Sequence, residues 1–163
     1  VYLDLKIVED IPINNVSIDT RTIKKESLFI AIKGDKFDGN NFVEEAFSRG
    51  ASIAVVDNKK FLKTRKKNII YVKNTINALK KISENIIKKY EGTVIAITGS
   101  NGKTTTTNII ANSLNNTSKT LGNYNNEIGM PLSIINASPN SKNIVMEIGA
   151  SKIGDINYLS KIQ

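Results

Sequence analysis

A glycine-bracketed turn between an apolar run and a hydroxyl-rich segment constrains this 163-residue chain more than any other feature. Residues 94–97 are continuously apolar, which is typical of a buried parallel strand. The turn at residues 99–102 follows, and residues 103–114 could continue as a helix. The apolar face of that helix would consist of Ile109, Ile110 and Leu114. The stretch therefore predicts a strand, a glycine-rich turn and a helix in succession.

This succession gathers backbone N–H groups and a helix N-terminus, the arrangement that holds phosphate in many proteins. Lys103 would neutralise the outer phosphates of a nucleotide such as ATP, and the Thr104 hydroxyl would bind Mg²⁺. The candidate nucleotide-binding residues are Gly99, Ser100, Asn101, Gly102, Lys103, Thr104 and Thr105. The full P-loop pattern has another glycine five positions before Gly102, where this chain has Ile97. An ordinary turn is the alternative, but the flanking strand and helix favour a phosphate site.

The composition narrows the chemistry further. The chain has no cysteine and no histidine, which excludes disulfides and removes the commonest general base and transition-metal ligand. Any metal is therefore expected on oxygen ligands, which favours Mg²⁺ over Zn²⁺. The sequence has no apolar run long enough to span a bilayer and no signal-peptide pattern at its start. We expect no membrane insertion and a cytoplasmic location.

The excess of basic residues raises the possibility that the chain binds nucleic acid. Lys plus Arg number 23 and Asp plus Glu number 15, which gives a net charge of +8. Residues 59–67 are the most basic run and could contact nucleic acid. No aromatic interleaving or nucleic-acid motif accompanies the run, so a solvated connection between two strands is the favoured interpretation. The excess charge still favours anionic small substrates.

Apolar runs and turn signals predict two α/β units, with a boundary near residue 75. In the first unit, strands are expected at residues 16–18, 28–32, 53–56 and 69–72. A helix is expected from Asn41 to Gly50, after a turn centred on Asp38-Gly39. A longer helix capped by Asn74 would extend to about Tyr90.

The second unit adds a candidate carboxylate and a loop rich in asparagine. A short helix is expected at residues 131–135, a buried strand at 144–146, and a last helix after Asp155. Glu147 ends that strand, so it could hold the same Mg²⁺ as Thr104, because ligands bind beyond the carboxyl ends of parallel strands. A solvent-facing glutamate is an equal alternative. The asparagines of the loop are Asn123, Asn125 and Asn126, and on spacing alone they are turn formers.

Several stretches together resemble the ATP-dependent Mur ligases of peptidoglycan synthesis. Residues 97–105 look like the shortened P-loop of that family, and residues 122–131, 146–150 and 154–156 are similar to its later motifs. Residues 19–21, 28–34 and 37–42 are similar to its uridine-nucleotide domain. Within the family, the likeness is greatest to the members that join D-alanyl-D-alanine to UDP-N-acetylmuramoyl-tripeptide.

The resemblance implies a uridine-nucleotide-binding α/β domain at residues 1–75. A linker helix and the first part of a P-loop, Rossmann-like ATP-binding domain would follow at 76–163. It implies that Asp19, Thr20 and Arg21 approach the UDP group, and that Asn125 and Asn126 meet the same substrate. Lys103, Thr104 and Glu147 would serve catalysis, with ATP and Mg²⁺ as cofactors, in a monomer. Asn40 stands where relatives commonly have histidine.

The family's modified lysine, its metal-binding histidine and its amine-substrate domain have no counterpart in this sequence. We therefore expect a fragment that does not turn over by itself. Two further hypotheses remain. One is a sister ligase that adds L-lysine or diaminopimelate to UDP-muramoyl-dipeptide, although its loop usually carries Thr-Thr-Pro where this chain has residues 125–129. The other is a non-catalytic nucleotide- or nucleic-acid-binding module.

Overall fold

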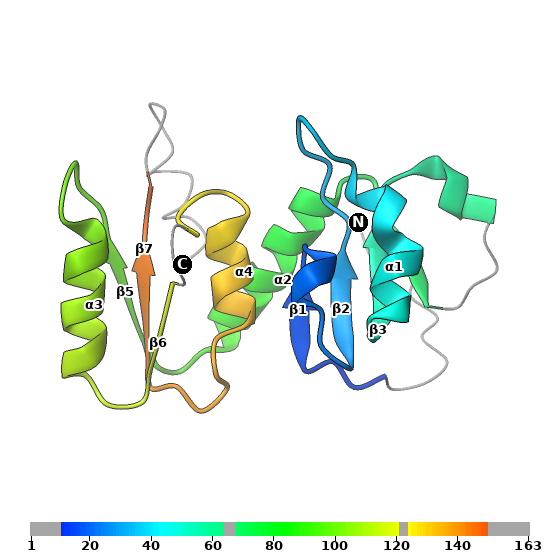
Figure 1. Cartoon of the computed structure of the whole chain (residues 1–163). Coiled ribbons are helices and arrows are strands. Elements are labelled where there is room, and N and C mark those ends of the chain that lie inside the picture. The colour runs from blue at the N-terminus through cyan, green and yellow to red at the C-terminus, as the bar shows by residue number, and fades with distance from the viewer. Residues whose placement is uncertain (1–10, 64–67, 121–123, 150–163) are drawn as a thin grey trace. The chain divides into compact units, whose positions relative to one another are not determined.

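The computed structural model describes residues 11–63, 68–120 and 124–149. The chain is divided into two compact units, Val1–Thr75 and Ile76–Gln163. Each unit is built on a sheet whose strands all run parallel, so the predicted α/β class is confirmed. Parallel strands require crossover connections, and helical segments provide them in both units (Figure 1).

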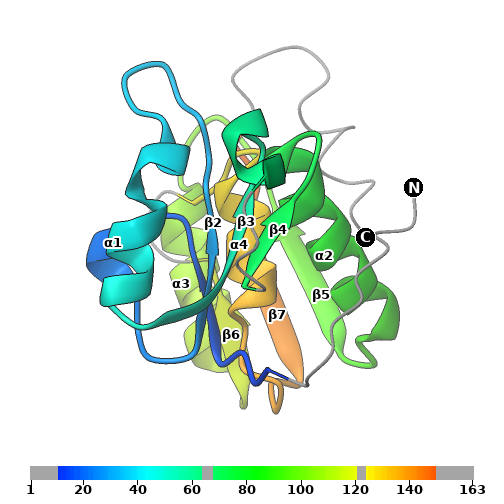
Figure 2. The ribbon, with the colours of Figure 1, turned by 90° about the vertical axis from the view of Figure 1, so that its right-hand side faces the viewer.

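The first unit has a four-stranded sheet with the strands in sequence order. Its strands are β1 (Asn15–Ser17), β2 (Ser27–Ile30), β3 (Ala51–Val56) and β4 (Ile69–Tyr71). Its helical segments are η1 (Thr20–Thr22), η2 (Gly39–Phe42), α1 (Val43–Ser48) and η3 (Lys59–Lys63). Helix α1 packs against this sheet beside β3 (Figure 2). Its core joins Phe29 of β2 and Val56 of β3 to Val43 and Ala46 of α1, all at most 1% exposed.

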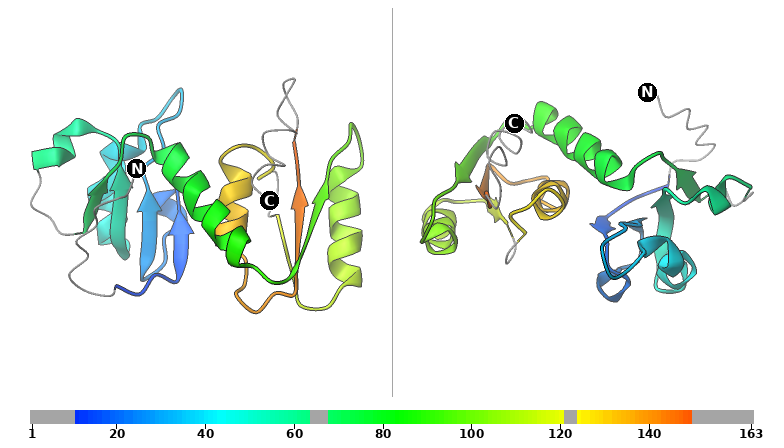
Figure 3. Two further views of the ribbon diagram at one scale, coloured as in Figure 1. Left: turned by 180° about the vertical axis from the view of Figure 1, so that it is seen from behind. Right: turned by 90° about the horizontal axis from the view of Figure 1, so that it is seen from above.

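The second unit has a three-stranded sheet in the order β5-β7-β6. Its strands are β5 (Thr93–Ile97), β6 (Thr117–Lys119) and β7 (Asn143–Glu147). Its helices are α2 (Thr75–Lys89), which begins at the last residue of the first unit, α3 (Lys103–Ser113) and α4 (Gly129–Ile135). Helices α3 and α4 cover opposite faces of the sheet (Figure 3).

The apolar core of the second unit lies on the α4 face. Met130 and Ile134 of α4 pack with Ile144 and Met146 of β7, and Ile87 of α2 completes the cluster. Each of these side chains is at most 9% exposed. Residues 145 and 147 alternate with this set, so they point to the opposite face, where α3 lies. The strand pattern thus directs Glu147 toward the helix that follows the glycine-rich turn.

Two features around the glycine-rich turn differ from the sequence predictions, namely the burial of the strand before it and the apolar face of the helix after it. Strand β5 is at one edge of the described sheet and pairs with β7 alone, so Ala96 is exposed rather than buried. Ile109 is 61% exposed, and Leu114 lies just beyond the end of α3 with 36% exposure. The expected apolar face of α3 is therefore not buried within the described residues, because α3 instead turns Thr107 inward.

Element boundaries also differ from the predictions in places. Helix α4 starts at Gly129, so Pro131 lies in its first turn, and α1 starts at Val43 because residues 39–42 form a 3₁₀ helix. Strand β6 was not expected, since Thr-Ser-Lys lacks an apolar pattern. The helix expected after Asp155 lies outside the described residues. Across residues 11–63, 68–120 and 124–149, no helix combines the length and the apolar character that a membrane crossing requires.

Candidate functional site

The glycine-rich turn has the backbone geometry of an anion-binding loop. Gly102 adopts a left-handed conformation (φ 75°) at the N-cap of α3, and Gly99 also has a positive φ of 153°. A side chain at either position would be strained, because the left-handed region is unfavourable for residues with a Cβ atom. Gly102 has no side chain, so the first-turn N–H groups of α3 donate no hydrogen bond to a side chain at the N-cap.

The charges around this turn favour a negatively charged ligand. The first turn of α3, which the structure describes in full, contains no acidic residue. The positive end of the helix dipole therefore meets no carboxylate from that turn. The Lys103 ammonium donates a hydrogen bond of 2.8 Å to the Gly99 carbonyl, which holds this cation over the loop. The predicted loop residues 99–102 are exposed to solvent.

Glu147 is the buried carboxylate of the site. It is 4% exposed at the carboxyl end of β7, and it does not face solvent. Its Oε2 accepts a 2.7 Å hydrogen bond from the Thr104 hydroxyl, so the structure brings two predicted metal ligands together across 43 positions of sequence. A buried carboxylate is costly unless hydrogen bonds compensate it. Its Oε1 accepts a second bond, of 2.8 Å, from the Asn125 amide.

One residue that holds Glu147 was not among the sequence predictions. The Thr120 hydroxyl accepts a hydrogen bond of 2.9 Å from the backbone N–H of Glu147. Thr120 is 5% exposed and directly follows β6, so its hydroxyl lies at the same sheet edge. No local pattern pointed to this contact, since the partners are 27 positions apart. The one sequence feature that could have suggested a role for Thr120 is its position just before the loop rich in glycine and asparagine.

The two asparagines of the loop do different things. Asn125 donates to Glu147, and its backbone carbonyl accepts a 2.7 Å bond from the N–H of Gly149. Asn126 is exposed, and its side-chain oxygen accepts bonds from the N–H groups of Ile128 and Gly129. Asn126 thus accepts from the N–H groups of the N-cap residue and of the first residue of α4. Asn123 lies outside the described residues.

In the first unit, Asp19 and Arg21 form one cluster at the carboxyl end of β1. The Asp19 carboxylate caps η1 through the Arg21 N–H and accepts bonds of 2.6–3.0 Å from the Arg21 guanidinium. The side-chain hydrogen bond from Arg21 holds the pKa of Asp19 below its ordinary value. Thr20 turns away from this pair, since it is 9% exposed and its hydroxyl donates to Glu45 at 3.1 Å.

Asn40 stands where members of the family that this chain resembles commonly have histidine, and it is 2% exposed. Its Nδ2 donates to Asp38 at 2.7 Å and to Asp57 at 2.8 Å, and its Oδ1 accepts from two backbone N–H groups. Asp57 in turn accepts a 3.2 Å bond from the Thr75 hydroxyl at the start of α2. The hydrogen bond from Asn40 lowers the pKa of Asp38. This network joins the ends of the first unit's elements to one another.

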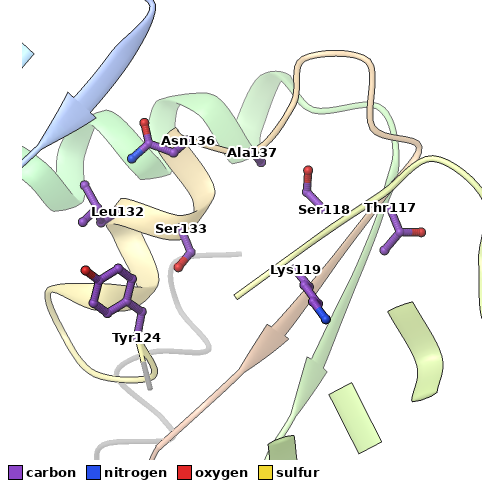
Figure 4. Close-up of a pocket in the computed structure, with 8 residues that line it drawn as sticks. All are labelled: Thr117, Ser118, Lys119, Tyr124, Leu132, Ser133, Asn136 and Ala137. Carbon is purple, nitrogen blue, oxygen red and sulfur yellow. The ribbon is translucent and has the colours of Figure 1, made fainter. Parts of the chain in front are cut away.

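A cavity of about 310 Å³ in the second unit lies away from the predicted residues. Figure 4 shows that side chains from α4 and from the segments just before and just after it form one wall, while β6 forms the other. The lining residues are Thr117, Ser118, Lys119, Tyr124, Leu132, Ser133, Asn136 and Ala137. None of the candidate site residues that the structure describes lines this cavity.

Comparisons with known proteins identify both units. Residues 12–89 match a family model described as "Mur ligase family, catalytic domain". Residues 97–163 match one described as "Mur ligase middle domain". Between them the two models account for most of the sequence, and their order along the chain follows the two structural units.

Curated relatives and solved structures agree with these matches. The UDP-N-acetylmuramoyl-tripeptide–D-alanyl-D-alanine ligase of Bacillus subtilis (strain 168) is 37% identical over 157 residues, 94% of this chain and 34% of that protein. The ligase of the same name from Buchnera aphidicola subsp. Baizongia pistaciae (strain Bp) is 40% identical over 158 residues, 95% of this chain and 34% of that protein. A MurF ligase from Thermotoga maritima, solved in complex with ADP, has a TM-score of 0.79 at 34% identity, covering 94% of this chain and 36% of that one. This chain thus spans about a third of the length of the relatives it matches.

Proposed function

We propose that this chain, which belongs to the Mur ligase family, is the part of a D-alanyl-D-alanine-adding ligase that holds the nucleotide substrate and the phosphates of ATP. The observation that carries the proposal is the convergence of the glycine-rich loop, Lys103 and the Thr104–Glu147 pair at one sheet edge. The relatives named above support the choice of reaction within the family. The reaction would join D-alanyl-D-alanine to UDP-N-acetylmuramoyl-tripeptide.

The Thr104–Glu147 pair fits a magnesium ion. Both donors are hard oxygens, and the two oxygens lie 2.7 Å apart. Two adjacent ligands of an octahedral Mg²⁺ are separated by about 3 Å, given metal–oxygen distances of about 2.1 Å. The pair would therefore accept the ion with little movement when the hydroxyl proton turns away from the carboxylate. Bound there, Mg²⁺ would neutralise charge on the nucleotide phosphates.

The proposed reaction needs no covalent bond between the protein and the substrates. The terminal carboxylate of the peptide would attack the γ-phosphorus of ATP, which releases ADP and leaves an acyl phosphate. The amine of D-alanyl-D-alanine would then displace inorganic phosphate and lose a proton as the peptide bond forms. The first step needs positioning and charge neutralisation, which Lys103 and the N-terminus of α3 would supply.

The first unit would bind the UDP end of the substrate. Arg21 supports this role, because its side chain is 82% exposed at the carboxyl edge of the sheet. Thr20 supports it less, since its hydroxyl is directed to Glu45. ATP and Mg²⁺ as cofactors, a cytoplasmic location and a monomeric state complete the proposal.

The experiment uses the full-length protein and follows phosphate release from ATP. UDP-muramoyl-tripeptide and UDP-muramoyl-dipeptide are each offered with D-alanyl-D-alanine, L-lysine or diaminopimelate. We expect release only with the tripeptide and D-alanyl-D-alanine. Release with the dipeptide and an amino acid would identify the sister ligase instead, and no release in any reaction would contradict a ligase function.

A further inference from the structure

We propose that Asn125 is a positioning residue that fixes the carboxylate of Glu147, rather than the substrate contact that the family resemblance implied. The proposal rests on the function proposed above and deepens it. Its basis is the 2.8 Å hydrogen bond from Asn125 Nδ2 to Glu147 Oε1. A carboxylate cannot donate when ionised, so the donor in this contact is the amide.

The hydrogen bonds divide the two carboxylate oxygens of Glu147 between two tasks. Oε1 is engaged by the Asn125 amide, while Oε2 faces the Thr104 hydroxyl at 2.7 Å. The backbone of Glu147 is fixed separately, because its N–H donates to the Thr120 hydroxyl. The carboxylate plane is therefore held from one side, and a single oxygen is presented to the proposed metal. Partners of this kind orient metal ligands and tune their affinity.

The loop that carries Asn125 packs so closely against Gly149 and Gly129 that neither position has room for a side chain. Its carbonyl accepts the Gly149 N–H at 2.7 Å, and a Cβ atom at Gly149 would lie 2.8 Å from Asn125 Oδ1. On the other side, a Cβ atom at Gly129 would lie 2.4 Å from the Cα of Tyr124. Real Cβ atoms do not approach other atoms so closely, so both glycines allow the loop to pack where it does. The position of the Asn125 amide thus follows from the backbone.

A substrate contact would use the same amide differently. The Nδ2 group of Asn125 would have to leave Glu147 in order to donate to a sugar hydroxyl or a phosphate. That exchange would leave the Oε1 atom of a carboxylate that is 4% exposed without its hydrogen-bond donor, which is unfavourable for a buried charged group. The two roles therefore predict different defects when the amide is removed, one in metal affinity and one in substrate affinity.

The test compares Asn125→Ala and Asn125→Leu in the full-length protein. Binding of Mn²⁺, used in place of Mg²⁺, is followed by electron paramagnetic resonance in the presence of ADP. We expect the dissociation constant for Mn²⁺ to rise about tenfold in both variants. The affinity for ADP in EDTA should stay at the wild-type value, and so should the KM for UDP-muramoyl-tripeptide. Asn125→Ala decides the outcome if the bulkier leucine prevents folding.

Asn143→Ala is the matched control. Asn143 lies at the opposite end of β7, and its amide donates hydrogen bonds to the Asn115 carbonyl and the Thr117 hydroxyl. Removing it should leave Mn²⁺ affinity unchanged, which separates the orientation of Glu147 from general loosening of the strand.

Glu147→Gln separates failure of this inference from failure of the proposed function. If Glu147→Gln weakens Mn²⁺ binding and the Asn125 variants do not, the positioning role is wrong and the metal site stands. If the Asn125 variants raise the KM for the nucleotide substrate instead, Asn125 is a substrate contact. If Glu147→Gln binds Mn²⁺ like the wild type, the metal site of the proposed function is itself wrong.

Gly149→Ala provides an independent perturbation. The added methyl group would displace the Asn125 loop from Glu147 without removing the amide. We expect the same weakening of Mn²⁺ binding as in Asn125→Ala, measured at a temperature where circular dichroism shows a folded protein. Wild-type Mn²⁺ affinity in a folded Gly149→Ala protein would contradict the proposal.

Discussion

The carboxyl edges of the two parallel sheets carry similar polar residues and use them differently. In the first unit, Asn40 bridges Asp38 and Asp57, and both aspartates are hydrogen-bonded within the unit. In the second unit, the loop at residues 99–102 is exposed, and Lys103 rests on a backbone carbonyl. The second edge thus combines the N-terminus of α3, whose first turn contains no acidic residue, with a lysine ammonium beside the loop, and both features favour phosphate.

A second contrast shows where a buried polar group serves structure. Asn40 and Glu147 are almost equally buried, at 2% and 4% exposure. Asn40 meets two carboxylates and two backbone N–H groups of its own unit. Glu147 accepts a hydrogen bond from the hydroxyl of an exposed residue, Thr104, in the first turn of α3. Burial alone therefore does not distinguish the two roles, whereas the exposure of the partner does.

The largest effect on nucleotide binding is expected from Lys103→Ala. Removing the ammonium should weaken ADP binding by about 10- to 100-fold, because hydrogen bonds to charged groups contribute about 1.5–3 kcal/mol. Isothermal titration calorimetry on the full-length protein measures this. Lys142→Ala is the control, since Lys142 precedes the amino end of β7 and its replacement removes the same charge. Equal losses in both variants would reduce the effect to net charge and contradict the site.

Asn40→Leu should damage stability and leave nucleotide binding intact. It removes the donor to Asp38 and Asp57 and the acceptor for two backbone N–H groups, at a cost of about 2–4 kcal/mol. Hydrogen exchange of residues 27–56 in urea reports the loss within the first unit. Asn41→Ala, at an exposed neighbouring position, should cost far less. A reduced ADP affinity in folded Asn40→Leu would break the contrast between the two edges.

Thr107→Val should stabilise the second unit by about 1 kcal/mol, because it removes an uncompensated desolvation cost. Among the described residues, the Thr107 hydroxyl is the one buried side-chain polar atom without a hydrogen-bond partner. Valine replaces that hydroxyl by a methyl group of similar shape. Thr106→Val, at an exposed position of the same helix, should give no gain. Thermal unfolding of the two variants against the wild type provides the measurement, and equal midpoints for all three would refute the assignment.

The smallest effect concerns Asp19 and pH. Its folded pKa is lowered by Arg21, so the pair adds stability above the ordinary carboxyl pKa and loses it as pH falls through the lowered value. Since the Arg21 side chain is 82% exposed, solvent screening keeps the contribution small. Asp19→Asn should lower the thermal midpoint slightly at neutral pH, and the difference should shrink as pH falls below the ordinary carboxyl pKa. If the difference in thermal midpoint between Asp19→Asn and the wild type grew as the pH fell, the lowered pKa assigned to Asp19 would be contradicted.

The sequence predicted the features that depend on neighbouring residues. The glycine-rich turn, the strand before it, the helix after it and the carboxylate at the end of β7 follow from short patterns, and the structure has each of them. The meeting of Glu147 with Thr104 was expected, because both lie at the carboxyl ends of parallel strands. The contacts of Glu147 with Thr120 and Asn125 could not be predicted, because these residues lie 27 and 22 positions away along the chain. Strand β6 was missed for a similar reason, since its residues pair with β7 without an apolar pattern of their own.

Asn126 shows a second limit of the sequence. The resemblance assigned Asn125 and Asn126 one shared role, and nothing in their spacing distinguishes them. Tertiary packing separates them, because one amide faces Glu147 and the other caps the first N–H groups of α4. The residue type therefore predicted that this loop offers amide groups for hydrogen bonding. Which asparagine contacts Glu147 and which contacts the start of α4 depended on the position of α4, which the sequence alone did not give.

The contrast between the two edges is tested most directly by hydrogen–deuterium exchange of the full-length protein with and without Mg²⁺ and ADP. We predict slower exchange at residues 98–107 and 145–149 when the nucleotide is present. Exchange at residues 15–63 should stay unchanged under the same conditions. Protection by ADP at residues 19–42, or no protection at residues 98–107, would contradict a nucleotide site at the carboxyl edge of the second unit.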